Sequence, residues 1–293
     1  MALTLADSAK LSNDMVQRGV IETILDESPI LQMLPFETIE GNSYKYNQEN
    51  TLGGAQFYAV NAIWTEATAT FAQKSATLAI LGGDADVDNF IQRVRSNIQD
   101  QRAVQTALKA KSVVRAFEDS FIYGDTATDG NSFDGLMKLV PAAQVIDANA
   151  ALTLSQVDQG IDKVLGGKPG LIVTTKKQRR ALKALLQASA HYVERGETSF
   201  GRQVMLYDGI PVEVSDYLVD TETISAKTGG AQSSMYFIHF SAADGVLGLQ
   251  NGNLEAIDLG QLESKDAQRV RIRWYVSVAL LRDSAVGRVK RLN

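Results

Sequence analysis

The strongest periodic pattern in the chain runs from about Asp86 to Tyr123. Large apolar residues recur there at steps of three and four, with one polar interruption near Gln101 and no proline or glycine inside. The spacing predicts an amphipathic helix of about 37 residues, on the order of 55 Å long at 1.5 Å per residue. A helix so much longer than the globular average must pack on something extended. Its apolar positions are Val87, Phe90, Ile91, Val94, Ile98, Val104, Leu108, Val113, Phe117 and Phe121.

The residues before position 41 have an acidic, partly helical pattern. Leu11, Met15, Ile21 and Leu25 recur at helical intervals, and Ser28 is followed by a proline. Because a residue before proline avoids the right-handed helical region, we predict an amphipathic arm that stops there, followed by an extended leader. The charged residues of this region are Asp7, Asp14, Glu22, Asp26, Glu27, Glu37 and Glu40, against Lys10 and Arg18.

Residues 41–82 differ in composition from the residues before them, because they are rich in threonine, aromatic and small side chains. The stretches 43–50, 55–67 and 68–81 are typical of long strands, and the glycine pair at 53–54 indicates a flexible tip. The region contains too few large aliphatic residues to form a core by itself. We therefore expect it to lie on another surface.

Beyond Pro141, helical and strand patterns alternate. The spacing predicts helices over 155–167 and 176–189, the first of them closed by glycine. Short apolar runs predict strands over 170–175, 210–218, 234–241 and 254–260.

A strand beginning at Gln268 shows the period-two alternation of a half-buried strand. Its polar face carries Arg269, Arg271 and Arg273, followed by Tyr275. Like charges on one strand face are costly unless acids lie opposite, so we expect carboxylates of this or another subunit beside them. The apolar face consists of Val270, Ile272, Trp274, Val276 and Val278.

Composition narrows the chemistry open to the chain. Its 293 residues include 29 Lys and Arg against 34 Asp and Glu, giving a formal net charge of −5, with two histidines and no cysteine. The lack of cysteine excludes a disulfide framework, a zinc finger, an iron–sulfur cluster and a thiol nucleophile. A pI near 5.2 argues against a protein that holds nucleic acid by charge alone.

The size and hydrophobicity predict a folded globular chain. With 45% hydrophobic residues, it can form one large or two ordinary domains around a sizeable core. No stretch approaches the roughly 20 apolar residues of a membrane span, and the N-terminus lacks the features of a signal peptide. We expect a soluble protein made and kept in a cytoplasm, without membrane contact.

Three loops approach functional signatures and fail them. Residues 130–135 have an aspartate where the hydrolase elbow needs its second glycine. A calcium loop starting at Asp125 would lack acidic ligands at its third and twelfth positions. The stretch 166–170 has Pro169 where a phosphate loop needs serine or threonine. We interpret the first two as turns and predict no catalytic, cofactor or metal site.

The histidines and one basic run have simple interpretations. Neither His191 nor His239 has a ligand partner at metal-binding spacing, so we interpret both as packed or surface side chains. The basic run opens the helix predicted at 176–189, where cations oppose the helix dipole. An anionic partner and a solvated surface are both open interpretations there. The run consists of Lys176, Lys177, Arg179, Arg180 and Lys183.

An acidic arm, a long hairpin and a long helix cannot bury themselves in one compact domain, so we predict an assembly protein. The order of these elements resembles the major capsid proteins of tailed double-stranded DNA bacteriophages, which have the Hong Kong-97 fold. The resemblance covers nearly the whole chain and rests on residues 28–41, 43–81, 87–139, 207–218 and 269–292.

The resemblance implies an α+β fold with five segments. These are an N-terminal arm (1–40), an extended β-hairpin loop (41–82), a peripheral domain with the long spine helix (83–140), a mainly axial domain (141–262) and a return strand to the peripheral domain (263–293). It implies a structural protein, not an enzyme, that assembles through hexamers and pentamers into an icosahedral shell around double-stranded DNA. The expected location is the virion, assembled in the host bacterial cytoplasm.

The expected partners follow from the same resemblance. They are further copies of the chain, a separate scaffolding protein or none, a portal, decoration proteins, and packaged DNA held by weak non-specific contact. Many relatives carry an N-terminal scaffolding segment that a protease removes. Because this sequence opens at Met1 directly into the arm, we expect that it is not cut. Some relatives cross-link a loop lysine to a neighbour, and Lys45 and Lys74 lie in this loop, but no acceptor is identifiable.

Two groups of residues are predicted intersubunit contacts. Rigid aromatic side chains dominate buried contact energies, although packing within the chain is an equal alternative for each of them. The arginines of the C-terminal strand are predicted to meet arm carboxylates of another subunit. The two groups are Tyr44, Tyr46, Phe57, Tyr58 and Trp64 in the loop, and Arg269, Arg271 and Arg273 in the strand.

Two rival functions remain at this point. An encapsulin, a bacterial compartment shell of the same fold, would enclose cargo enzymes in place of a genome. A soluble enzyme could use clustered carboxylates, although acids without a partner motif are usually a solvated turn. The carboxylates in question are Glu66, Asp84, Asp86 and Asp88.

Overall fold

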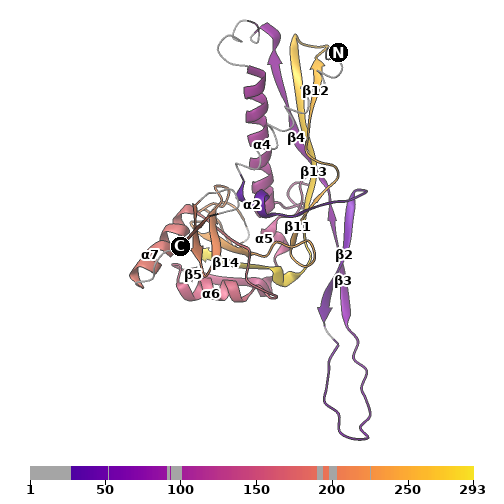
Figure 1. Ribbon diagram of the computed structural model, residues 1–293, viewed down its shortest axis with the longest axis vertical. Coiled ribbons are helices and arrows are strands. Elements are labelled where there is room, and N and C mark those ends of the chain that lie inside the picture. Colours follow the sequence, from indigo (N-terminus) through magenta and orange to yellow (C-terminus); the bar gives the residue numbers. More distant parts are fainter. Residues whose placement is uncertain are drawn as a thin grey trace, which may run out of the picture.

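Figure 1 shows an elongated molecule in this computed structural model. A long helix and long strands rise from a compact lower body, and a hairpin descends beside it. The predicted arm helix, with Leu11 and Leu25, lies outside the described residues. Those are residues 28–51, 53–90, 93, 101–189, 194–197, 203–224 and 226–293.

The described chain begins with a short helix, α2 (Pro29–Met33), where the sequence predicts an extended leader. The Ser28 hydroxyl accepts a hydrogen bond from the Leu31 amide at 3.2 Å and donates one to the Glu118 carboxylate at 2.5 Å. The prediction is wrong at this point because proline, with its fixed φ and missing N–H, is also favoured at the first position of a helix.

A five-stranded sheet surrounds β13 (Ala267–Leu280), the strand predicted near the C-terminus. Along one side of β13 runs β4 (Ala79–Asp88), antiparallel. Along the other side lie β12 (Glu255–Gln261) and β11 (Val246–Gln250), also antiparallel. Strand β1 (Phe36–Thr38) pairs in parallel with β11. The predicted alternation in β13 is confirmed, since its apolar side chains are buried.

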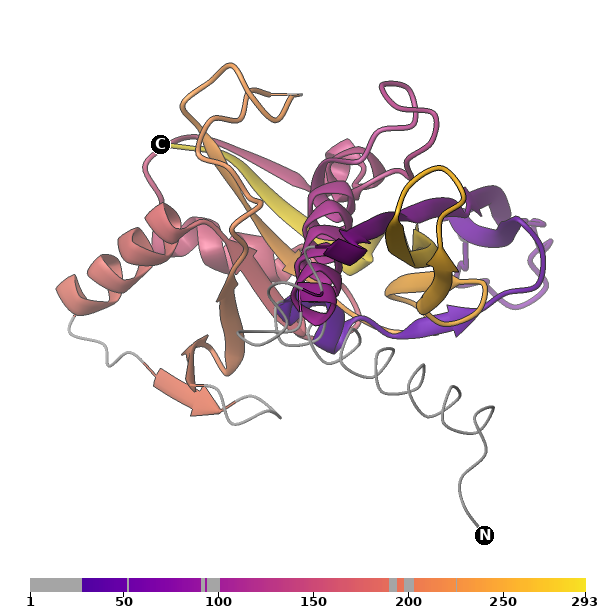
Figure 2. The ribbon, with the colours of Figure 1, turned by 90° about the horizontal axis from the view of Figure 1, so that it is seen from above.

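The long helix α4 (Gln101–Tyr123) packs against the buried face of this sheet. Val113, Phe117 and Phe121 are buried as their spacing predicts, and the ring of Phe117 lies 5.2 Å from that of Trp274. Figure 2, which looks along α4, places the five-stranded sheet on one side of it and α7 on the other.

The predicted helix start at Asp86 is wrong. Residues 79–88 form β4, in which Val87 is buried and Asp86 points to the opposite face. Val87 fits both the helical and the strand period, and pairing with the open side of β13 decides for the strand. Leu108 is also an exception, because it is 54% exposed on α4. Ile91, Val94 and Ile98 lie outside the described residues.

A seven-stranded sheet forms the lower body, with α6 (Leu154–Asp162) and α7 (Lys176–Ala188) packed beside it. Both helices were predictable, and each begins with a capping threonine, Thr153 and Thr175. The strands lie in the order β5 (Val145–Ala150), β14 (Val286–Leu292), β10 (Ser233–Ile238), β6 (Leu171–Thr174), β9 (Ile210–Val214), β8 (Gln203–Tyr207) and β7 (Glu194–Glu197).

The segment 269–292 is not the single closing strand that the sequence predicts. After β13, a 3₁₀ turn, η2 (Asp283–Ala285), redirects the chain, and β14 enters the seven-stranded sheet between β5 and β10. Conversely, β11 and β12, which fall in the predicted 141–262 segment, belong to the five-stranded sheet. The boundary predicted at residue 262 therefore does not separate the strands of one sheet from those of the other.

The hairpin consists of β2 (Ser43–Thr51) and β3 (Thr70–Thr77), paired antiparallel. Residues 53–69 contain no strand, so the strand predicted over 55–67 is wrong. Two short elements, α5 (Leu136–Leu139) and η1 (Ala142–Gln144), complete the α+β fold that the sequence predicts. Within the described residues, no helix combines the length and the apolar character needed to span a membrane.

Candidate interaction surface

The base of the hairpin is fixed to the body by tyrosines and a buried amide. The rings of Tyr44 and Tyr46 stack with 6.0 Å between centroids and pack on a cluster that includes Leu247. The Gln48 side-chain amide donates to the Leu280 carbonyl at 2.7 Å. Burial raises the pKa of Tyr46 above its ordinary value. The base is therefore part of the folded subunit.

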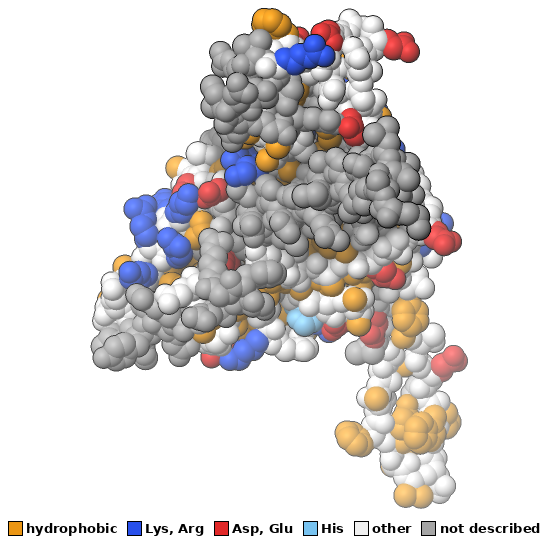
Figure 3. Space-filling model, turned by 45° about the horizontal axis from the view of Figure 1, so that its top comes forward, with side chains coloured by type: hydrophobic (Ala, Val, Ile, Leu, Met, Phe, Trp, Pro, Cys, Tyr) orange, Lys and Arg blue, Asp and Glu red, His pale blue; other side chains and the backbone are white. Residues whose placement is uncertain are grey.

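The end of the hairpin, residues 53–71, has the opposite character. Trp64 is 78% exposed although its ring stacks on Tyr58 at 4.3 Å, and Phe57 is fully exposed. Figure 3 shows the apolar side chains gathered on this projection, at the lower right of the view. The other large apolar residues exposed at this tip are Val60, Ile63 and Phe71. An exposed apolar group of this kind marks a surface that another molecule covers.

The structure thus divides the five aromatic candidates. Tyr44 and Tyr46 pack within their own chain. Phe57, Tyr58 and Trp64 lie together at the tip, where the Tyr58 ring stacks on Trp64 and its hydroxyl forms hydrogen bonds with Thr65. The three tip residues remain predicted contacts with another subunit.

The arginines of β13 form an ion-pair ladder across three strands. Arg269 binds Asp86 through Nε and Nη2 at 2.6 and 2.7 Å, and Arg271 binds Asp84 through the same atoms at 2.7 and 2.8 Å. Arg273 of β13 meets Glu255 of β12, with 2.6 Å from Nη2 to Oε2. The expectation that acids lie opposite the arginines is confirmed, and these acids belong to the same chain.

The ladder changes what can be expected of the arm. Hydrogen bonds from Arg271 and Arg269 hold the pKa values of Asp84 and Asp86 below their ordinary values. Because each arginine already has a carboxylate, the ladder does not need acids from another subunit. The arm carboxylates before Ser28, such as Asp14, lie outside the described residues, and the predicted pairing with the arm of another subunit stays a prediction.

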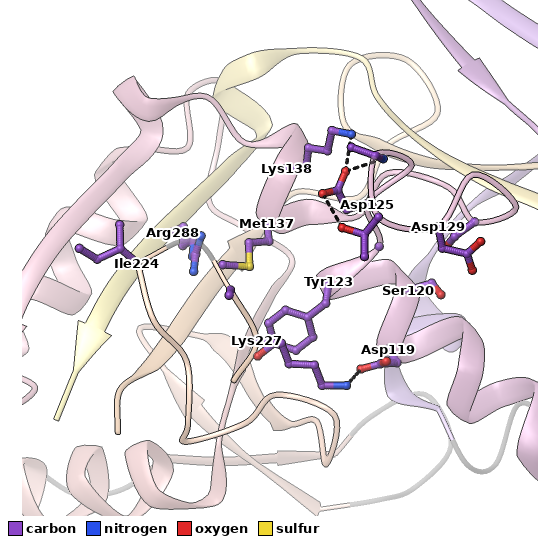
Figure 4. A pocket seen from close by; sticks show the side chains of 15 residues that line it. Asp119, Ser120, Tyr123, Asp125, Asp129, Met137, Lys138, Ile224, Lys227 and Arg288 are labelled. Atoms are coloured by element: carbon purple, nitrogen blue, oxygen red, sulfur yellow. Dashed lines mark hydrogen bonds and ion pairs between the residues drawn. The ribbon is translucent and has the colours of Figure 1, made fainter. Parts of the chain in front are cut away.

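A cavity of about 650 Å³ lies between the end of α4, the loop 124–135, α5 and the loop that contains Ile224 and Lys227. Figure 4 shows Lys227 reaching Asp119 and Lys138 reaching Asp125 across its wall. Burial, followed by the charge of the nearby Glu222, raises the pKa of the Tyr123 hydroxyl well above its ordinary value. The three cations of this wall, Lys138, Lys227 and Arg288, are each paired with an acid.

Behind this cavity lies a buried polar cluster that the sequence does not reveal. The Glu222 carboxylate accepts hydrogen bonds from the Tyr123 hydroxyl at 2.5 Å and from Ser234, and Arg288 is 3.3 Å away. The Arg288 guanidinium lies over the ring of Tyr236 at 5.4 Å. These residues come from α4, a loop, β10 and β14, and no local spacing connects them.

The loops that approached known motifs behave as turns. Asp125 accepts the Ala127 amide at 2.9 Å and pairs with Lys138 at 2.5 Å. His239 lies 3.4 Å from Asp244, and His191 is outside the described residues. Over the described ranges, no three histidine, aspartate or glutamate side chains are grouped to hold a metal ion.

The carboxylates of the rival enzyme hypothesis do not form a site. Asp84 and Asp86 are held by arginines, and Asp88 accepts the Phe90 amide at 2.8 Å. Glu66 belongs to the exposed tip of the hairpin, whereas the three aspartates belong to β4.

A long helix against a long-stranded sheet, a second sheet domain and a projecting hairpin are the parts of a capsid-type shell subunit. The sequence profile of the SU10 major capsid protein matches residues 6–291, and the chain belongs to this family. It is a phage major capsid protein with the Hong Kong-97-type fold, a structural component of the virion.

Solved structures have the same fold at low sequence identity. The holo-SrpI encapsulin complex from Synechococcus elongatus PCC 7942 is 18% identical, with a TM-score of 0.69 over 91% of this chain and 89% of that one. The Microbacterium phage Oxtober96 structure is 13% identical, with a TM-score of 0.66 over 91% of each chain. The capsid of the native GTA particle is 15% identical, with a TM-score of 0.65 over 90% of each chain. No curated protein matches the sequence.

Proposed function

We propose that the subunit assembles through hexamers and pentamers into an icosahedral shell that encloses packaged double-stranded DNA in the host cytoplasm. The observation that carries this proposal is the hairpin tip, which exposes Phe57, Trp64 and their apolar neighbours away from any core of the chain. A second subunit would bury these side chains and convert their exposure into contact energy.

Each of the two sheets would form a different domain of the subunit in this shell. The five-stranded sheet with α4 would form the peripheral domain, and the seven-stranded sheet with α6 and α7 the axial domain around the symmetry axis. The hairpin and the part of the arm before Ser28 would lap over neighbouring subunits, whereas α2 and β1 pack within the subunit. Many modest contacts of this kind stabilise a shell through avidity. A scaffolding protein, a portal and decoration proteins are the further proposed partners.

Deletion of the tip tests the proposal. Replacing residues 55–67 by a short Gly-Ser linker leaves the pairing of β2 with β3 and the tyrosine base in place. We expect a folded subunit, with unchanged circular dichroism and melting temperature, that forms few shells in negative-stain images. Stable shells of normal yield from this variant would contradict the role of the hairpin.

An encapsulin-type compartment is the second candidate function, favoured by the similarity to the encapsulin complex. The two functions differ in what the shell contains. Purified shells from infected or expressing cells should contain double-stranded DNA if the proposal is right. Shells that hold a stoichiometric protein cargo and no DNA would establish the alternative.

A further inference from the structure

Helix α7 exposes a row of cations on its outer face. Arg179, Arg180 and Lys183 are exposed and Lys177 is half-buried, while Gln178, Leu182 and Leu186 on the opposite face are buried. We call these four cations the α7 cationic face. Figure 3 shows blue side chains gathered at the left of the molecule, where Figure 1 places α7.

The α7 cationic face is not neutralised within the described part of the chain. Helix α7 contains no aspartate or glutamate. Of the carboxylates near its start, Asp216 pairs with Lys176 at 2.6 Å, and Asp220 accepts the Thr175 hydroxyl at 2.7 Å. No carboxylate among the described residues pairs with the four cations of the face. In the ladder of β13 and in the cavity wall, by contrast, the cations are paired with acids.

This arrangement is unfavourable for the isolated subunit. Lys176 and Arg180, and likewise Arg179 and Lys183, are like-charged pairs at a spacing of four residues, which destabilises a helix. Cations in the first turns also oppose the partial positive charge of the helix N-terminus. An anionic partner would remove both costs.

We propose that the α7 cationic face binds the phosphate backbone of duplex DNA, which places α7 on the inner side of the shell. The inference rests on the proposed function, in which the shell encloses DNA. From Lys177 to Lys183 the helix rises about 9 Å, and 9 Å of duplex axis carries about five phosphate charges. Four cations therefore match the charge density of a duplex over their own length.

The acidic arm is a weaker fit to this face. The apolar positions of the arm, such as Leu11 and Met15, would need an apolar surface to pack on. Apart from cations, the exposed residues of α7 are Ala184, Gln187 and Ala188, which offer little apolar surface. Phosphates need no apolar surface. Contact with phosphates alone carries no sequence information, so binding is expected to be weak and independent of sequence.

The test uses the full-length, unassembled subunit and a fluorescein-labelled duplex of about 30 base pairs, titrated by anisotropy at several salt concentrations. The variant K177Q/R179Q/R180Q/K183Q removes the face. The matched control K45Q/R115Q/K168Q/K265Q removes four exposed cations elsewhere. For the α7 variant we expect affinity at about 0.1 M salt to fall at least tenfold. The slope of log K against log salt should flatten by about 3 to 4, because each lost phosphate contact removes about 0.9. The control should retain the wild-type slope.

Equal affinities and slopes for the wild type and the α7 variant would overturn the proposal. A peptide of residues 1–27 serves as the competing ligand. If it binds the wild type through the four cations and the duplex does not, the face belongs to the arm and the proposal is wrong. If the fourfold variant melts below the wild type, R180Q/K183Q replaces it, with about half the change in slope expected.

Negative-stain images of the same variants separate this proposal from the proposed function. Shells of normal form with a reduced DNA content support the role of α7. If the wild type itself forms no shell, the proposed function fails, while the titration of the unassembled subunit still decides the DNA contact.

Discussion

Glu222 and Arg288 lie 66 residues apart in the sequence and form a buried ion pair, with 3.3 Å between Oε2 and Nη2. The same carboxylate accepts the hydroxyl of Tyr123 at the end of α4, and Ser234 of β10 donates to it as well. The pair therefore connects the long helix, which packs on one sheet, to two neighbouring strands of the other sheet. It lies beside the apolar core that the two halves share.

Replacing Arg288 by methionine should destabilise the subunit strongly. The change leaves Glu222 buried with no cation, and removing one partner of a buried pair typically costs about 3–5 kcal/mol. Urea unfolding of the unassembled subunit measures this effect. The control is Lys168→Met, which breaks an exposed pair with Asp208 and should cost at most about 1 kcal/mol. Equal effects of the two variants would show that burial of the pair contributes nothing.

Substitutions at the tip and at the base of the hairpin should have different effects. Trp64→Ser with Phe57→Ser removes exposed apolar groups, so we expect an unchanged melting temperature and a loss of shell assembly. Tyr44→Ala with Tyr46→Ala removes rings packed on the body, so the subunit itself should melt at a lower temperature. Differential scanning fluorimetry and light scattering separate the two readouts. A tip variant that melts early yet assembles normally would reverse the assignment.

Acid should weaken the ion-pair ladder of β13. The pKa values of Asp84 and Asp86 are lowered from 3.8 by hydrogen bonds to Arg271 and Arg269, so both bind protons less readily in the folded state. Their contribution to stability is thus complete well above pH 3.8 and is lost as the pH falls through the lower, folded-state values.

Melting temperatures of the unassembled subunit between about pH 7 and pH 2.5 test this dependence. The variant D84N/D86N should be less stable than the wild type at neutral pH, and the difference should shrink at the acid end. A difference that stays constant over the whole range would show that the two carboxylates titrate alike in the folded and unfolded states.

Gly160 of α6 should not tolerate alanine, although alanine is the better helix former by about 1 kcal/mol. A Cβ at this position would lie 2.2 Å from the ring of Phe237. The ring of Phe237 is fully buried, and crowding a packed core is destabilising, so we expect a net loss of about 1–3 kcal/mol, measured by urea unfolding. Gly130→Ala is the matched control, since nothing lies within 4 Å of its added Cβ. It should be neutral.

Local patterns in the sequence predicted those elements whose burial follows their own period. The alternation in β13, the helices α6 and α7, and the buried face of α4 around Phe117 all agree with the structure. In each case one face is apolar over several turns or residue pairs, so a local pattern is sufficient. The order of these elements along the chain also carried the resemblance to capsid proteins, which the family match confirmed.

The errors occur where a distant partner chose between two locally reasonable structures. Residues 86–88 follow a helical spacing, but they form part of β4 because they pair with β13. Residues 55–67 look like a strand, yet no strand among the described residues lies beside them. The sequence of residues 269–292 predicts one closing strand, but the chain turns at η2 after β13, and β14 joins the other sheet.

The sequence by itself determined the α+β character, the order of the elements, the charge balance and the exclusion of thiol and multi-histidine chemistry. Only the tertiary structure decided which charges are paired: the arginines of β13 find Asp84, Asp86 and Glu255 within the chain, and Glu222 finds Arg288. It also separated the anchored tyrosines of the hairpin from the exposed aromatic tip. The physical reason is that burial and charge pairing depend on residues far apart in the chain, whereas periodicity depends only on neighbours.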